Sequence, residues 1–503
     1  MKDTKRLKPV IAGAAAMLVV ALACIAVIAK MPAQAKSCTA LFAGLAMLAC
    51  ATVCTVVLCK KVKFEITAAV TVAVIAMMFA LIFPPFSVPD EKVHYATAYS
   101  YSNKLMLDFS DGDDYVFMRS DDCKLINSSD VRVSGENIFR VGNEFSFFNG
   151  SKDKEMCFES LCTFRFFAYL PSAIGITIGR LCCLGAYPVF YLARIFNALF
   201  FAVLMFIALK EMPFNKGALA VIGLLPMSLH LSGGCTYDVY TIGLTLIMFA
   251  RLVRLIYSKG GLSTKDFVTT LIICLLAIPY KIVYFTVPLI ALLIPKERFK
   301  NGKRRAICVS AIILAGLLGI AALQIPARLG RLTGAEEGII ENTYTLGMLV
   351  KNPIGTVKLL FNTLCITASW YYETMLGRFL GWLEFGLPSI YVVVFTLLLF
   401  VAFIKKEDEP APLKAGGRLL CALCAFITVI VTMLLLCIGW TPAGSPFIQG
   451  VQGRYFIPIL PLVMLAVRNN TLVLKKDIDR YLVLAGGMAN IFLLLRVCMG
   501  MFT

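Results

Sequence analysis

The sequence predicts an all-α polytopic membrane protein with about 13 transmembrane helices. Of its 503 residues, 59% are hydrophobic and only 16% are charged, whereas a water-soluble chain averages about 45–50% apolar and about 25% charged. The apolar residues form many runs of roughly 20, the length that crosses a hydrocarbon core about 30 Å thick. In such a protein the net charge of +18 indicates Lys and Arg gathered in cytoplasmic loops, not a nucleic-acid partner. These features exclude a soluble enzyme, a disordered protein and a coiled coil.

The first two predicted spans, 9–28 and 39–59, form a transmembrane hairpin within residues 1–63. Lysines and an arginine precede the first run, so the N-terminus is expected in the cytoplasm. A third span, 66–83, then leads outward into a long polar loop at 84–163. This loop is acidic and too charged to cross the membrane, so we expect it outside, with helices that lie on the membrane surface.

The main transmembrane domain is predicted to extend from 64 to 503. Its run 164–183 is ambiguous, because two arginines and a proline interrupt it, and it either spans or lies along the surface. The surface position keeps the dense basic cluster at 296–305 in the cytoplasm, as the positive-inside rule favours. The later spans are predicted at 187–209, 217–231, 237–250, two short runs that meet at 279–281, 306–324, 388–403, 418–440, 455–467 and 481–499, with a second outer loop at 325–387.

Asp90, Glu91 and His94 directly follow the third span and form the first candidate site. Adjacent carboxylates at a membrane surface repel each other unless a cation, a base or water compensates. In a helix that begins at Pro89, Asp90 and His94 are four residues apart and share a face. That spacing suits a divalent metal ion (Mg²⁺ or Mn²⁺) or a base with its orienting partner. The alternative is helix capping, because Asp after Pro is common at helix starts.

Three further charged residues lie at breaks between apolar runs on the predicted outer face: Asp238, Lys281 and Arg454. A phosphate is a natural ligand for both cations, as a point charge for Lys281 and as a planar fork for Arg454. Each also has a simpler interpretation. In that interpretation, Asp238 only caps a helix and Arg454 only marks a helix start. Lys281 would be an interfacial lysine that snorkels between aromatic anchors.

The remaining polar signals are weaker. Trp382 and Glu384 precede the span at 388–403, where an aromatic anchor beside a solvated carboxylate is the alternative to a binding site. His230 lies in an apolar run and is predicted to be an interior histidine. The sequence holds no phosphate-binding loop and no dinucleotide fingerprint, so we expect no nucleotide cofactor. The polar loop contains three cysteines, of which any two could form one disulfide: Cys123, Cys157 and Cys162.

In order and spacing, these motifs resemble the bacterial membrane proteins of domain-of-unknown-function family 2142. The resemblance covers about residues 64–467, and the opening hairpin looks like an addition to the common pattern. It rests on the segments 89–94, 232–238, 281–295, 381–388 and 450–458. That family in turn is similar to the GT-C glycosyltransferases, multi-helix enzymes that take a sugar from a polyprenyl-phosphate carrier.

The resemblance implies an inverting transfer on the outer face of the cell membrane. The donor would be a polyprenyl-phosphate-linked sugar held in an apolar groove, and the acceptor a cell-surface glycan or a lipid-linked molecule. Asp90 is the first choice for the general base and Glu91 the second. Arg454 and Lys281 would bind the donor phosphate, alone or with a divalent ion. The resemblance assigns that ion to Asp90, Glu91 and His94, and it assigns substrate contacts to Tyr237, Asp238, Trp382, Glu384 and Gln452.

Two other functions fit the same sequence. A transporter or flippase of a lipid-linked glycan also needs an anionic-ligand site and a lipid groove, but it predicts functional charges at mid-membrane on several helices. A non-catalytic partner or sensor predicts a dispensable Asp90–Glu91 pair and an important outer loop.

Overall fold

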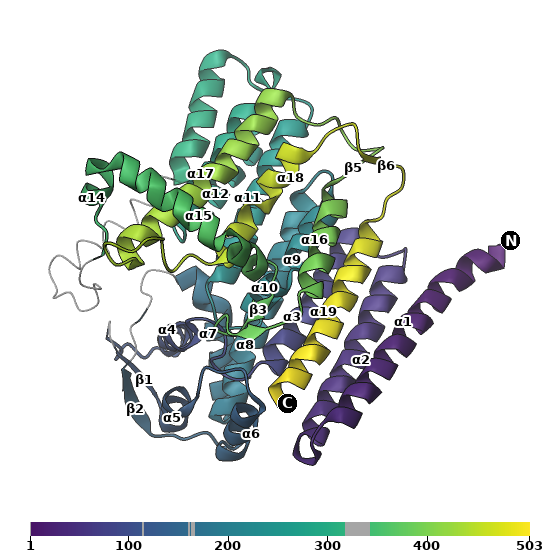
Figure 1. Cartoon of the computed structure of the whole chain (residues 1–503), viewed down its shortest axis with the longest axis vertical. Coiled ribbons are helices and arrows are strands. Elements are labelled where there is room, and N and C mark those ends of the chain that lie inside the picture. The colour runs from purple at the N-terminus through teal and green to yellow at the C-terminus, as the bar shows by residue number, and fades with distance from the viewer. Residues whose placement is uncertain (1, 113–114, 159–160, 162–165, 317–342, 503) are drawn as a thin grey trace.

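The computed structural model describes residues 2–112, 115–158, 161, 166–316 and 343–502. The chain is mostly helical with very little sheet, as predicted, and its long helices pack side by side (Figure 1). Within the described residues, 7 helices are long and apolar enough to cross a membrane. Four more apolar helices are shorter than 18 residues. The predicted count of about 13 spans is therefore not confirmed.

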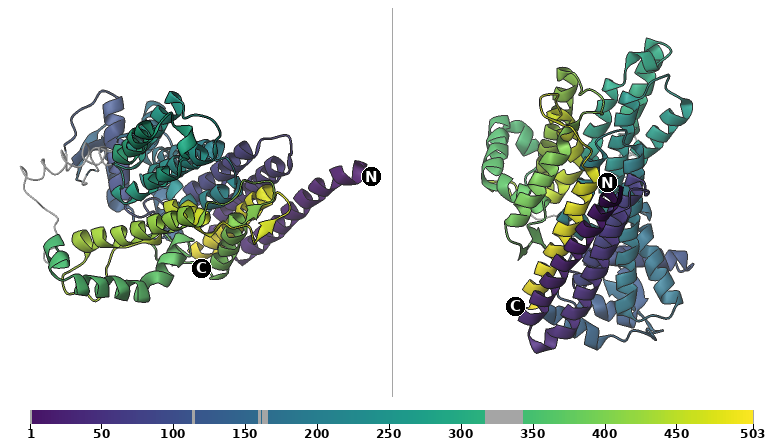
Figure 2. Two further views of the ribbon diagram at one scale, coloured as in Figure 1. Left: turned by 90° about the horizontal axis from the view of Figure 1, so that it is seen from above. Right: turned by 90° about the vertical axis from the view of Figure 1, so that its right-hand side faces the viewer.

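The N-terminal hairpin consists of α1 (Lys2–Lys30), the 3₁₀-helix η1 (Ala33–Ala35) and α2 (Lys36–Leu58). Pro32 follows α1 closely, and the residue before a proline is disfavoured in a helix, so the chain turns there. The helix α2 packs against α1, α3 (Phe64–Ile82) and α19 (Asp479–Phe502). The N-terminal end of α1 leans away from the other helices (Figure 2).

The centre of the bundle is formed by α8 (Ala186–Glu211) and α11 (Asp238–Tyr257), which pack against each other. Nearly all of α11 is buried, which suits a helix that is apolar all round. In the sequence between α8 and α11, the prediction of one continuous helix over 217–231 is wrong. It forms two short helices, α9 (Lys216–Gly223) and α10 (Pro226–Ser232), because Pro226 cannot continue a helix through its missing N–H.

The polar loop after α3 folds into a compact unit, which we call the loop subdomain (residues 91–158). Strands β1 and β2 pair antiparallel, from Tyr115 opposite Phe158 to Arg119 opposite Lys154. The strands and helices contribute, together with α7 and α8, to a second hydrophobic cluster that is separate from the main core. The expectation of helices in this loop is correct, and the sheet is an addition. Its elements are α4 (Glu91–Leu105), β1 (Tyr115–Arg119), α5 (Ser120–Ser128), α6 (Gly135–Glu144) and β2 (Lys154–Phe158).

The ambiguous run forms α7 (Phe166–Leu181), and its residues 164–165 lie outside the described part. At 16 residues the helix is about 24 Å long, short of the roughly 30 Å of a hydrocarbon core. It packs against α4 on one side and α8 on the other. The length therefore favours a helix that does not cross the membrane by itself.

The C-terminal half contains shorter and broken helices. The predicted span 306–324 is helical over 302–316, and its remaining residues, like 325–342 of the predicted second outer loop, lie outside the described part. Pro288 and Pro458 fall inside 3₁₀ segments, where the continuous α-helical ladder is interrupted. The elements are α12 (Thr264–Ala277), η2 (Ile282–Leu293), η3 (Lys296–Arg298), α14 (Leu346–Lys351), α15 (Pro353–Met375), β3 (Phe379–Leu380), β4 (Phe385–Gly386), α16 (Ile390–Phe403), β5 (Lys405–Lys406), α17 (Ala415–Trp440), η4 (Gly453–Ile459), α18 (Leu460–Val467) and β6 (Val473–Leu474).

Candidate functional site

The loop between α3 and α4 presents Asp90 to solvent. Its three prolines keep residues 83–90 out of a helix. Asp90 has a φ of 60°, in the left-handed region that non-glycine residues rarely adopt. Its side chain is 51% exposed, whereas the next side chain, that of Glu91, is fully buried. The two adjacent carboxylates therefore occupy different environments.

Glu91 is engaged in a buried ion pair with Arg194 of α8. The guanidinium Nε donates to Oε1 at 2.8 Å and Nη2 donates to Oε2 at 2.6 Å, with both side chains at 0% exposure. The backbone N–H of Cys235 also donates to Oε1 at 2.9 Å. A buried pair of this kind is stable only when its remaining hydrogen-bonding sites are satisfied, as they are here. Asp90 is consequently the accessible carboxylate of the two.

Arg194 and Asn197 on α8 also fix the loops on either side of the site. Arg194 donates to the carbonyl oxygens of Phe83 at 2.6 Å and Pro84 at 2.8 Å, at the end of α3. Asn197 donates to the carbonyl oxygens of Gly234 at 2.6 Å and Thr236 at 3.2 Å. Neither residue was singled out from the sequence. The available signal was an arginine within the apolar run of α8, which is costly in a membrane unless it is paired.

A second ionic network joins four of the predicted site residues. Arg454 in η4 lies between two carboxylates, with Nη2 3.2 Å from Asp90 Oδ2 and Nη1 3.3 Å from Asp238 Oδ2. Asp238, the first residue of α11, also accepts from Lys281 Nζ at 2.9 Å. Residues from four separate segments thus alternate in charge, and we call Asp90, Arg454, Asp238 and Lys281 the charged network.

The cations of this network are buried. Arg454 is 6% exposed, and its Nε has no hydrogen-bond partner among the residues that the structure describes. Lys281 Nζ lies 4.1 Å from the ring centre of Tyr455, within range of a cation–π contact. Burial by itself lowers the pKa of Lys281, but Asp238 and the neighbouring tyrosines raise it above its usual value. Both groups therefore remain cationic and are suited to an anion.

His94 packs beside the network. Its Nδ1 lies 2.8 Å from the hydroxyl of Tyr169 on α7, and its ring meets that of Tyr237 edge-on. No group of three His, Cys, Asp or Glu side chains arranged for a metal ion occurs in the described parts of the chain. Glu91 pairs with Arg194 and His94 contacts Tyr169, and the metal ligands Asp90, Glu91 and His94 stay a prediction.

The segment 381–384 covers the loop that carries Asp90. Trp382 donates its indole N–H to the carbonyl oxygen of Phe86 at 3.2 Å, while 41% of the residue remains exposed. The backbone N–H of Gly381 donates to His230 Nε2 at 3.1 Å, which confirms His230 as an interior histidine. Glu384 is exposed beyond this turn. On the other side, Gln452 precedes η4, and its Oε1 is buried without a partner in the described structure.

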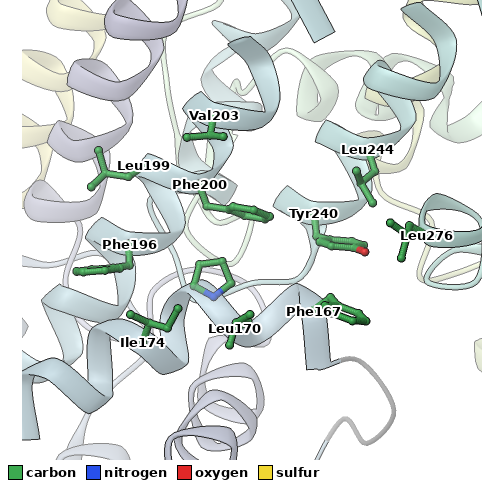
Figure 3. A pocket seen from close by; sticks show the side chains of 11 residues that line it. Phe167, Leu170, Ile174, Phe196, Leu199, Phe200, Val203, Tyr240, Leu244 and Leu276 are labelled. Atoms are coloured by element: carbon green, nitrogen blue, oxygen red, sulfur yellow. The ribbon is translucent and has the colours of Figure 1, made fainter. Parts of the chain in front are cut away.

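An apolar groove opens beside Tyr240 of α11 (Figure 3). It has a volume of about 600 Å³ and is walled by α7, α8, α11 and α12. Tyr240 lines the groove two residues after Asp238, and its ring lies 4.5 Å from that of Tyr280, the residue before Lys281. The groove walls seen in Figure 3 are entirely apolar apart from the Tyr240 hydroxyl: Phe167, Leu170, Pro171, Ile174, Phe196, Leu199, Phe200, Val203, Tyr240, Leu244 and Leu276.

The fold and site together define a multi-pass membrane protein with a charged network whose cations are buried, and with an apolar groove between four helices. The chain belongs to the family described as predicted membrane protein (DUF2142), whose model matches residues 74–463. All members of the charged network lie within this range, and α1 and α2 precede it. No curated protein and no solved structure matches the chain.

Proposed function

We propose that the protein is a glycosyltransferase that moves a sugar from a polyprenyl-phosphate-linked donor to a cell-surface glycan or a lipid-linked acceptor. The proposed reaction takes place on the outer face of the cell membrane, with the N-terminus in the cytoplasm. The motifs that resemble GT-C enzymes favour this reaction. The stronger support is the chemistry of the site.

The carrying observation is that Tyr240 links the apolar groove to the segments that carry the charged network. A lipid-linked sugar needs an apolar channel for its chain and cations for its phosphate. Here Tyr240 lines the groove two residues after Asp238, and its ring contacts that of Tyr280, which precedes Lys281. Arg454 retains a buried, unused N–H donor at Nε, which a phosphate oxygen would accept. Asp90 lies on the exposed side of Arg454, where a hydroxyl acceptor would approach from solvent.

In the proposed reaction, Asp90 accepts the proton of the acceptor hydroxyl as its oxygen attacks the anomeric carbon. The bond from that carbon to the phosphate oxygen breaks, and the polyprenyl phosphate leaves with an additional negative charge. Arg454 and Lys281 stabilise this charge at a position already shielded from water. A donor phosphate would draw Arg454 from Asp90, which would free the carboxylate to act as the base.

The other predicted residues have supporting parts in this proposal. The exposed indole face of Trp382 offers a surface for a sugar ring, with Glu384 beside it. Tyr237, Asp238 and Gln452 would orient the donor head group. Glu91 serves the reaction only through Arg194, as the anchor of the Asp90 loop. A divalent ion would add Lewis-acid stabilisation of the phosphate, but Glu91 and His94 have other partners, and we derive no step from it.

The test is sugar transfer by the purified full-length protein in lipid nanodiscs, from a panel of polyprenyl-phosphate sugars. We expect Asp90→Asn to lose at least about a hundredfold in kcat, as removal of a general base does. Asp130→Asn, on the exposed surface of the loop subdomain, is the matched control and should retain the wild-type rate. Undiminished transfer by a folded Asp90→Asn protein would refute the site.

The alternative of a transporter or flippase is separated by a second readout. Reconstituted protein that moves a fluorescent polyprenyl-phosphate sugar between leaflets without transferring the sugar would overturn the proposal. Wild-type transfer without movement of the lipid would support it.

A further inference from the structure

Two cysteines of the loop subdomain face each other across its interior. Cys123 of α5 is 3% exposed and Cys157 of β2 is 1% exposed. Both are thiols in this structure. Their side chains are close enough to form a hydrogen bond, and both belong to the second hydrophobic cluster.

The fold brings this pair together from distant parts of the sequence. Cys157 stands opposite Val116 in the two-stranded sheet, and α5 packs against both strands. Most of the 18 cysteines lie in apolar helices, where a thiol acts as a small hydrophobic group. Cys123 and Cys157 instead lie in the part of the chain that is proposed to face outward, where disulfides persist.

We propose that Cys123 and Cys157 form a disulfide that links α5 to β2. The two thiols lose two protons and two electrons to the disulfide of a thiol–disulfide oxidoreductase, which leaves as a dithiol. The new bond closes the loop of chain between residues 123 and 157, which contains α6 and most of β2. The location of the reaction on an oxidising side rests on the orientation in the proposed function, whereas the pairing itself rests only on the fold.

The bond would constrain the helix that follows Asp90. Asp122, next to Cys123 on α5, accepts from the hydroxyl of Tyr99 on α4 at 2.7 Å. Asp122 also forms an ion pair with Arg119 at 2.6 Å. Arg119 in turn donates from Nη1 to the carbonyl oxygen of Leu184 at 2.7 Å. All of these groups except Leu184 belong to the loop subdomain, so a covalent link in its interior opposes the local opening of α4.

The first experiment uses the purified full-length protein in detergent, treated with oxidised glutathione or with dithiothreitol. Free thiols are alkylated and the peptides are identified by mass spectrometry. We expect a linked peptide pair that contains Cys123 and Cys157 after oxidation, and no such pair after reduction. Free alkylation of both residues after oxidation, or links to the exposed Cys182 or Cys183 instead, would overturn the proposal.

A second measurement compares the oxidised and reduced wild-type protein, so its main result needs no variant. Hydrogen exchange of the α4 and α5 peptides in the wild type should become about tenfold slower on oxidation, because loop closure disfavours the open state. Cys123→Ser should abolish this change, and Cys182→Ser is the matched control that should preserve it. Equal exchange in the oxidised and reduced wild type would contradict the proposed link.

Alkylation of thiols in intact cells separates the test of the Cys123–Cys157 pairing from the test of the outward orientation of the loop subdomain. Rapid alkylation before lysis should recover the Cys123–Cys157 disulfide. Recovery of both thiols in cells, from a protein that forms the bond with glutathione, would overturn the outward orientation. Failure to form the bond with glutathione would overturn the pairing and leave the proposed sugar transfer untouched.

Discussion

Replacement of Arg194 by Met should strongly destabilise the folded protein. The substitution retains an apolar stem in α8 but leaves the carboxylate of Glu91 buried without its counter-charge. Removal of one partner of a buried ion pair costs about 3–5 kcal/mol. The carbonyl oxygens of Phe83 and Pro84 also lose a donor, so we expect a loss near the upper end of that range.

A double-mutant cycle with Glu91→Gln tests the cause of this loss. Glu91→Gln alone leaves Arg194 unpaired and should also cost about 3–5 kcal/mol. The double variant contains neither buried charge, so its cost should fall below the sum of the two by about 3 kcal/mol. What remains reflects the carbonyl oxygens of Phe83 and Pro84, which lose their donor with Arg194 and cost about 1–3 kcal/mol each if unsatisfied.

The assay is reversible unfolding of the full-length protein in mixed micelles with increasing fractions of sodium dodecyl sulfate, followed by tryptophan fluorescence. The matched control is Arg132→Met, whose side chain is 76% exposed and lies 4.0 Å from Asp130. Its effect should remain within about 0.5 kcal/mol. Single-variant losses below about 1 kcal/mol, or additive effects in the double variant, would refute the assignment of Glu91 and Arg194 as a coupled anchor.

Three further predictions concern the network, the groove and the loop subdomain. Arg454→Lys keeps the charge but removes the planar fork, so the KM for the donor in the transfer assay should rise about tenfold while the protein stays folded; an unchanged KM would contradict phosphate binding by Arg454. Val203→Trp fills the groove, and it should raise the KM of a long-chain donor while that of a donor with two isoprene units changes little; equal effects on both would argue against the groove as the chain site. Lys154 lowers the pKa of Asp108 to about 2 through a direct ion pair. Because the folded-state pKa is depressed, the pair stabilises the protein above the ordinary carboxylate pKa of about 3.9 and is lost as the pH falls toward 2. Asp108→Asn should therefore lower the melting temperature at pH 6 and have no effect near pH 2, and a loss of the same size at both values would exclude this pair as its cause.

The sequence alone pointed to the charged network because ionisable residues in a membrane protein are rare and expensive. Asp90, Asp238, Lys281 and Arg454 each interrupt or border an apolar run, and the structure joins them within 3.3 Å of one another in succession. Their catalytic and phosphate-binding roles stay predictions. The family assignment is also confirmed, since the matching model covers 74–463.

Sequence spacing could not assign the partner of Glu91. Its position next to Asp90 predicts a second base or a metal ligand, because the sequence shows only neighbouring residues as partners. Its actual partner is Arg194, 103 residues along the chain. The pairing between Cys123 and Cys157 was equally undetermined, because three connectivities were open before β2 and α5 were folded together.

Hydrophobicity and charge thus determined the class of this protein, because water excludes long apolar runs and membranes exclude unpaired charges. They did not determine the number of spans, since a run broken by Pro226 or shortened like α7 has the composition of a span without its length. The groove lined by Tyr240 is likewise a product of tertiary structure alone. Its walls come from four helices, and each apolar residue on them is indistinguishable in sequence from one that faces lipid or fills the core.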